Sequence, residues 1–264
     1  LVAEAAHPQA DVFWSGDPMR ALVLVRKGLA ERYISPGAAD IPSAFKAPDG
    51  SWTGFAARAR VLLVNKNKVA PADVPRSIRD LASARFKDQA AIANPLYGTT
   101  TMHVAAWFAT WGDDETKRFL NALRANGVVV ASSNGEVKRL VASGEVSVGL
   151  ADTDDAHEAI EEKAPVDVVW PDQDDLGTLV VPTVAVLVKG GPHPEAGKAL
   201  IDHLLTADVE REMAASAAHM PLRPDVHVQG VRGLSDVRAM KVDYERLATE
   251  TERVQPWLRD WVGL

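Results

Sequence analysis

The segment from Ser132 to Glu162 predicts a capped helix, a buried strand and a second helix, in that order. Helix-forming residues come first, and the apolar run that follows them has the length of a buried strand. Three carboxylates then fall within four residues, at Asp152, Asp154 and Asp155. Open α/β sheets bind ligands at the carboxyl ends of their strands, where the next segment begins. This segment therefore predicts both an α/β fold and a candidate binding site.

Strands and helices alternate along most of the chain. Short apolar runs at Ala10–Trp14 and Ala90–Asn94 are typical of buried strands, and Asp113–Gly127 has the acidic start and terminal glycine of an amphipathic helix. This alternation predicts an α/β fold with a largely parallel sheet. Two longer apolar strands, at Arg58–Asn65 and Thr178–Lys189, are long enough to run from one lobe into another. They predict two lobes that are joined by a two-strand hinge and close around a ligand.

Prolines mark the starts of two further predicted helices. Asp17 and Pro18 follow the first predicted strand, and proline is favoured in the first turn of a helix. Residues 69–86 (VAPADVPRSIRDLASARF) carry apolar residues at helical spacing after a proline. They predict a loop that leads into a single helix.

The composition excludes several classes of function. A net charge of −7 and a pI near 5.5 argue against a nucleic-acid surface, which needs clustered lysine and arginine. The absence of cysteine excludes disulfides and thiolate metal sites. No apolar run approaches the roughly 18 residues of a membrane span, and no signal-peptide pattern is present in this sequence. The Walker, GxGxxG, GxSxG and HExxH motifs are absent as well.

The three crowded aspartates allow two interpretations. Acidic residues at a helix N-terminus interact favourably with the helix dipole, each by roughly 0.3–1 kcal/mol, so they can be purely structural. Three carboxylates within four residues also repel one another, and a nearby cation would relieve that repulsion. The cation could be a metal ion, the amine of a ligand or an arginine of the protein.

Hydroxyl and amide side chains follow two other predicted strands. Gly98, Thr99 and Thr100 open an apolar helix after one strand, and Asn134 follows two serines after the next. The backbone N–H groups of such a helix start, together with the hydroxyls, would form an anion site. Simple N-capping is the alternative.

Arg58 and Arg60 lie on one face at the start of a long apolar strand. An arginine that is buried in such a strand needs a carboxylate or another anion as its partner. The sequence leaves open whether this partner is an aspartate of the protein or a bound ligand.

Six segments together resemble the extracellular solute-binding proteins of ABC importers. The segments are DVFWSGDP, DGSWTGFAARARVLLVNK, NPLYGTTTMH, ASGEVSVGLADTDDA, residues 171–205 and HMPLRPDV. They cover almost the whole chain in the order and at the spacing of the family. The resemblance is to the branch that contains the periplasmic ferric-iron-binding and phosphonate-binding proteins.

The resemblance implies an α/β, two-lobed type II periplasmic-binding-protein fold with mixed, mostly parallel sheets. Residues 1–59 plus 183–232 would form the N-terminal lobe, and residues 60–182 plus 233–264 the C-terminal lobe. Members of the family begin with a strand–helix–strand unit, which takes on the order of 30 residues. Nine residues precede Ala10 here, so we expect that unit to be missing and the N-terminal lobe to be incomplete.

The resemblance also implies a set of site residues. In the ferric-binding members two adjacent tyrosines hold iron, and the matching positions here are Asp154 and Asp155. The chain has three tyrosines, none adjacent to another, so a di-tyrosine ferric site is excluded. Asp154 and Asp155 are the candidate metal ligands. The expected ligand-binding residues are Ser15, Asp17, Arg58, Gly98, Thr99, Thr100, Asn134, Asp152, Asp154 and Asp155.

The resemblance predicts a non-enzymatic, monomeric substrate-binding component of an ABC importer. It would work in the periplasm or outside the cell, with a membrane permease as its partner and no nucleic acid. Its ligand would be a metal–anion complex such as ferric iron with an anion, or a small zwitterion such as an aminophosphonate. No cofactor is expected beyond such a bound metal ion with its small anion.

Two alternatives use the same architecture. The effector-binding domain of a bacterial transcription regulator would adjoin a DNA-binding helix pair. A metal-assisted enzyme built on the aspartates would need an activated nucleophile or an acid–base pair. A signal peptide upstream would favour the transporter, and a helix-turn-helix would favour the regulator.

Overall fold

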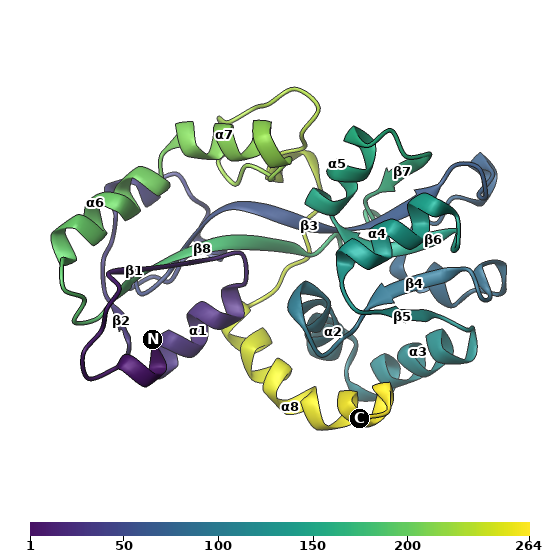
Figure 1. The fold of residues 1–264 in the computed structure, drawn as a ribbon, viewed down its shortest axis with the longest axis horizontal. Helices are drawn as coiled ribbons and strands as arrows, with labels where there is room; N and C mark the ends of the chain where they lie inside the picture. Colours follow the sequence, from purple (N-terminus) through teal and green to yellow (C-terminus); the bar gives the residue numbers. More distant parts are fainter. The chain divides into compact units, whose positions relative to one another are not determined.

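The computed structural model describes all 264 residues, which form two compact units (Figure 1). None of the helices is both long and apolar enough to cross a membrane. Unit 1 comprises Leu1–Arg58, Val180–Asp236 and Asp243–Glu245, and unit 2 comprises Ala59–Leu179, Val237–Val242 and Arg246–Leu264.

Unit 1 is built on a small antiparallel sheet. Strand β8 pairs with β1 and with β2, and helices α1 and α6 pack against it. The strands of unit 1 are β1 (Val12–Ser15), β2 (Ala30–Glu31), β8 (Val180–Val188) and the part of β3 (Thr53–Asn65) that ends at Arg58. Its helices are α1 (Pro18–Arg26), α6 (Pro194–Leu204) and α7 (Ala207–Ala217), with 3-10 helices η1 (Val2–Glu4), η2 (Pro36–Ala38), η3 (Ser43–Phe45) and η7 (Leu234–Asp236).

Helix α1 begins where the sequence predicts. Pro18 occupies its first turn, and the Asp17 side chain accepts a hydrogen bond from the Met19 N–H at 2.9 Å. The carboxylate thus satisfies one of the helix's unpaired N–H donors, as an N-cap residue does.

Unit 2 contains a mixed five-stranded sheet. Its order is β7–β3–β6–β4–β5, in which β4 is parallel to β5 and β6, whereas β3 is antiparallel to β6 and β7. The added strands are β4 (Ala90–Ala93), β5 (Val129–Ala131), β6 (Val148–Asp152) and β7 (Val166–Val169). The helices are α2 (Gly98–Trp111), α3 (Asp113–Ala125), α4 (Asn134–Ser143), α5 (Thr153–Glu161) and α8 (Tyr244–Val262), whose first two residues belong to unit 1.

Because β4, β5 and β6 are parallel, their carboxyl ends lie at one edge of the sheet. Each of them leads into a helix, namely α2, α4 and α5. The mixed sheet and the strand–helix alternation agree with the predicted α/β fold. The prediction of mostly parallel sheets is wrong: β4 pairs in parallel with β5 and β6, but the pairs of β8 with β1 and β2 and of β3 with β6 and β7 are antiparallel.

Aromatic residues from α2 and α3 fill the core of unit 2. Trp107 is fully buried, stacks on Trp111 at 5.6 Å between ring centroids and meets Phe119 edge-on at 5.2 Å. Leu258 and Trp261 of α8 close this core from the other end of the sequence. Such offset and edge-on pairs add to the free energy of apolar burial.

The prediction of a single helix within residues 69–86 is wrong. The structure has three 3-10 helices there, η4 (Pro71–Asp73), η5 (Ile78–Ala82) and η6 (Ala84–Phe86). Ser83 takes an extended conformation between the last two and so interrupts the helical path. Ser77 and Asp80 form a capping box that already satisfies the start of η5.

Gly149 lets α4 pack directly on β6. A Cβ atom at this position would collide with Val137 Cγ1 and would lie 2.9 Å from Val141 Cγ2. These β-branched side chains have few alternative rotamers. We therefore expect Gly149→Ala to lower the free energy of unfolding by about 1–3 kcal/mol, measured by urea denaturation. Gly135→Ala, whose Cβ would have no neighbour closer than 3.8 Å, is the matched control, and an equal loss in both variants would contradict this packing argument.

Candidate functional site

The helices α2, α4 and α5 all begin at the edge of the sheet where β4, β5 and β6 end. Helix α4 is capped by Ser133, whose hydroxyl accepts the Glu136 N–H at 3.1 Å. The residues before α2 and α5, Tyr97 and Asp152, provide no side-chain cap. The N-termini of α2 and α5 therefore keep backbone donors and the positive end of the helix dipole at this edge.

Arg60 holds the beginnings of these helices together. Its side chain is fully buried, and Nη1 donates to Asp152 Oδ1 at 2.5 Å, to Thr99 Oγ1 at 2.9 Å and to Asn134 Oδ1 at 3.2 Å. Nη2 donates to Thr100 Oγ1 at 3.0 Å. Thr99 and Thr100 belong to α2, Asn134 begins α4 and Asp152 precedes α5, so one guanidinium bonds to all three helix starts.

The polar side chains around Arg60 also bind one another. The Thr99 hydroxyl donates to Asp152 Oδ2 at 2.8 Å. Asn134 Nδ2 donates to Thr99 Oγ1 at 2.9 Å and to Asp152 Oδ2 at 3.2 Å. Of the two partners that the sequence left open for Arg60, the structure has the aspartate. Buried charges are tolerated when they are paired and hydrogen-bonded in this way.

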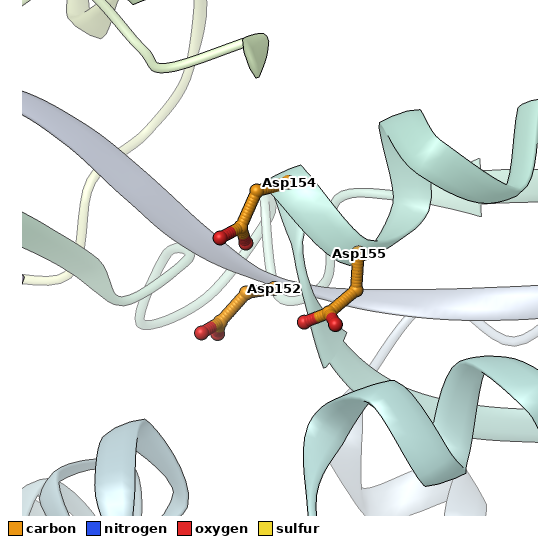
Figure 2. A group of neighbouring side chains, drawn as sticks. All are labelled: Asp152, Asp154 and Asp155. Atoms are coloured by element: carbon orange, nitrogen blue, oxygen red, sulfur yellow. The ribbon is translucent and has the colours of Figure 1, made fainter. Parts of the chain in front are cut away.

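Asp154 and Asp155 stand in the first turn of α5, beside this buried pair. Both are partly buried, and oxygen atoms of Asp152, Asp154 and Asp155 lie within 4.8 Å of one another. Figure 2 shows the three carboxyl groups near one another at the start of α5. Burial, followed by the charges of Asp154 and Asp152, raises the pKa of Asp155 to about 7, although Arg60 opposes the rise. Three carboxyl groups are thus concentrated beside the buried guanidinium of Arg60 at the start of α5.

The donor set suits a hard cation or an ammonium group. Carboxylate oxygens are ligands that hard cations prefer. The tyrosines do not add a phenolate pair: Tyr33 donates to Asp202 at 2.9 Å, and the buried Tyr244 donates to the carbonyl of Val180 at 2.8 Å, both in unit 1. Tyr97, which is exposed, is the residue before α2.

Three of the predicted ligand residues lie in unit 1, where the structure brings them together. The Ser15 hydroxyl accepts the Asp17 N–H at 3.1 Å, and Arg58 Nη2 donates to the carbonyl of Gly16 at 2.5 Å. Arg58 thus holds the loop between β1 and α1. Its role in ligand binding, like those of Ser15 and Asp17, stays a prediction.

Arg60 is absent from the predicted ligand set, although it bonds to the starts of three helices of unit 2. A signal for it is present in the sequence, because a second arginine in an apolar strand requires an anion. The antiparallel register of β3 and β6 places Arg60 directly opposite Asp152. That register is a property of the folded sheet and cannot be read from either strand alone.

Comparisons with known proteins agree on one family. A family model described as bacterial extracellular solute-binding protein matches residues 7–247. The chain is 27% identical over 266 residues to the "Putative 2-aminoethylphosphonate-binding periplasmic protein" of Salmonella typhi, covering 99% of this chain and 73% of that protein. It is 27% identical over 234 residues to iron uptake protein A1 of Synechocystis sp., covering 84% of this chain and 64% of that protein.

Solved structures show the same fold. Iron-bound HitA from Pseudomonas aeruginosa superposes with a TM-score of 0.88 at 23% sequence identity. The match covers 100% of this chain and 86% of that one.

Proposed function

Because the chain belongs to the family of bacterial extracellular solute-binding proteins, which are not enzymes, we propose that it is the substrate-binding component of an ABC importer. In this role it carries a small solute, in the periplasm or outside the cell, to a permease in the membrane. Ligand contacts that favour one conformation shift the population toward it, and the permease then recognises that conformation. Family membership favours this function over the enzyme and the transcription-regulator alternatives.

The charges of the unit 2 site favour a zwitterion with an ammonium group and a phosphonate or similar anion. Asp154 and Asp155 complement the ammonium group. The N–H groups of the first turn of α2 complement the anion, because no side chain caps that turn. The observation that carries this proposal is the hydrogen bond from Thr99 to Asp152 at 2.8 Å, which joins the start of α2 to the start of α5. The printed name of the Salmonella typhi relative includes 2-aminoethylphosphonate.

A metal ion with a small anion is the second candidate. Its support is the cluster of three carboxylates and the iron named for the Synechocystis and Pseudomonas relatives. It would use Asp154 and Asp155 in place of adjacent tyrosines. Loss of the phenolates removes the ligands that the resemblance assigns to ferric iron, so we place the zwitterion first.

Isothermal titration calorimetry with matched ligands tests both candidates. We expect 2-aminoethylphosphonate to bind, and ethylphosphonate, which lacks the amine, to bind at least about tenfold more weakly because it cannot form the ammonium contact with the carboxylates. Asp154→Asn together with Asp155→Asn should weaken 2-aminoethylphosphonate by about the same factor and leave ethylphosphonate unaffected. Asp174→Asn, an exposed aspartate outside the site, is the control.

Three outcomes would contradict the ligand assignment. Equal affinity for 2-aminoethylphosphonate and ethylphosphonate would show that Asp154 and Asp155 do not bind the ammonium group. Binding of ferric citrate, lost in the double variant, with no response to either phosphonate would establish the metal–anion candidate instead. A folded protein that responds to none of these ligands would overturn both.

A further inference from the structure

Ala56 has an unusual backbone conformation for a residue inside a strand. It is fully buried in β3, yet its φ is +41°. Residues with a Cβ atom rarely adopt positive φ, and glycine normally occupies such positions. Backbone strain of this kind persists where the surrounding structure fixes it, and it is frequent near functional sites.

The carboxylate of Glu210 fixes this conformation. Glu210 lies on α7 with no exposed surface, and its Oε1 accepts the Ala56 N–H at 2.8 Å. Oε1 also accepts the Leu222 N–H at 3.3 Å, and Oε2 accepts the Arg223 N–H at 3.2 Å. The buried guanidinium of Arg223 approaches Oε2 to 3.8 Å. One carboxylate thus joins the kink in β3 to two residues of a distant segment.

A short path leads from this kink to the predicted ligand residues of unit 1. Ala57 exchanges two backbone hydrogen bonds with Met220, at 2.8 and 2.6 Å. Arg58 follows, and its guanidinium donates to the carbonyl of Gly16, between Ser15 and Asp17. Side chains along a strand alternate between faces, so a change of φ at Ala56 would turn Arg58 away from Gly16.

We propose that Glu210 is a positioning residue for solute binding. It holds Ala56 at positive φ, and this kink directs Arg58 onto the loop that carries Ser15 and Asp17. Glu210 itself has no exposed surface, so it acts through the Ala56 N–H and not by contact with the solute. The proposal rests on the proposed function and on the predicted contribution of Ser15, Asp17 and Arg58 to the binding of the solute.

Four variants separate positioning from stability, with the Kd for 2-aminoethylphosphonate and backbone hydrogen exchange as the readouts. In Glu210→Gln an oxygen acceptor is replaced by a donor, so we expect exchange at residues 56, 222 and 223 to accelerate and the Kd to rise, each by about tenfold or more. Ala56→Gly alone should bind like the wild type. In the double variant that combines Ala56→Gly with Glu210→Gln, the glycine at position 56 adopts positive φ without strain. The Kd of this double variant should therefore lie within about threefold of the wild-type value. Glu212→Gln, exposed on the same helix, is the matched control.

The other possible results distinguish a positioning role of Glu210 from a purely structural one. Faster exchange in Glu210→Gln with an unchanged Kd would show that Glu210 is structural only and overturn the proposal, as would a double variant without recovery. If Glu210→Gln does not fold, Glu210→Asp, whose shorter side chain cannot reach all three N–H groups, should give a smaller rise in Kd, and wild-type affinity there would overturn the proposal. A wild-type protein that binds no ligand contradicts the proposed function instead, whereas hydrogen exchange still shows whether Glu210 holds the kink.

Discussion

Asp155→Asn should raise the free energy of unfolding by about 2–4 kcal/mol at pH 8 and by almost nothing at pH 4. In the folded protein, burial and the neighbouring Asp154 and Asp152 raise the pKa of Asp155 from 3.8 to about 7. Each unit of pKa difference between folded and unfolded states corresponds to about 1.4 kcal/mol. Asp155 is partly exposed, so solvent reduces the full value.

The sign follows from proton linkage. Between pH 4 and pH 7 the folded state holds the proton on Asp155 more tightly than the unfolded state does, so stability from this group falls as the pH rises. Asparagine at position 155 stays neutral at every pH, so the stability of the variant does not fall for this reason as the pH rises. Urea denaturation at pH 4, 6 and 8 should therefore show a gap between variant and wild type that widens with pH. Asp174→Asn, which is exposed, should show no such gap, and a difference for Asp155→Asn that is constant with pH would refute the prediction.

The loss of stability that comes from ionised Asp155 should be reversed when a cationic ligand binds. A cationic group placed beside Asp155 favours the ionised carboxylate, so a bound ammonium would lower its pKa and offset the repulsion among the three aspartates. Asp155→Asn, which should stabilise the protein without ligand, is thus expected to weaken the binding of the ligand. Opposed effects on stability and binding are what a site with concentrated like charges should give.

Much of the fold could be predicted because its signals are local. The cap by Asp17 before Pro18 and the acidic first turn of α3 each depend on residues within one helical turn. The apolar run of β3 is likewise visible in the sequence, since nearly every residue of Thr53–Asn65 is buried. Residues 69–86 were harder, because an extended Ser83 separates turns whose apolar spacing alone resembles one helix.

The site could be predicted in its position and only partly in its contacts. The sequence indicates the position of the site because three aspartates, Asp152, Asp154 and Asp155, fall within four residues. The structure does bring their carboxyl groups together. The pairing of Arg60 with Asp152 joins residues 92 positions apart and depends on strand register. The positive φ of Ala56 has no signal in the sequence, since alanine is not a turn-forming residue and its partner Glu210 is 154 positions away.

Arg60→Met should lower the free energy of unfolding by about 3–5 kcal/mol. It leaves Asp152, which is 1% exposed, as a buried charge without its guanidinium partner. Thr99 and Asn134 would still donate to that carboxylate, but neutral donors do not replace a cation. Urea denaturation measures the loss. Arg58→Met, in the same strand, is the matched control and should lose less than Arg60→Met, because Arg58 is only partly buried.

A second substitution shows whether the loss comes from the unpaired charge. Arg60→Met combined with Asp152→Asn removes both charges and keeps an amide that Thr99 and Asn134 can bind, so the double variant should lie within about 2 kcal/mol of the wild type. If the double variant is as unstable as Arg60→Met alone, the guanidinium stabilises unit 2 by filling space rather than by neutralising Asp152. If the double variant regains stability but does not regain ligand binding, the Arg60–Asp152 ion pair is needed for binding rather than for folding. In that case the fold tolerates the loss of both charges, whereas the starts of α2 and α5 need the pair to stay aligned for the ligand.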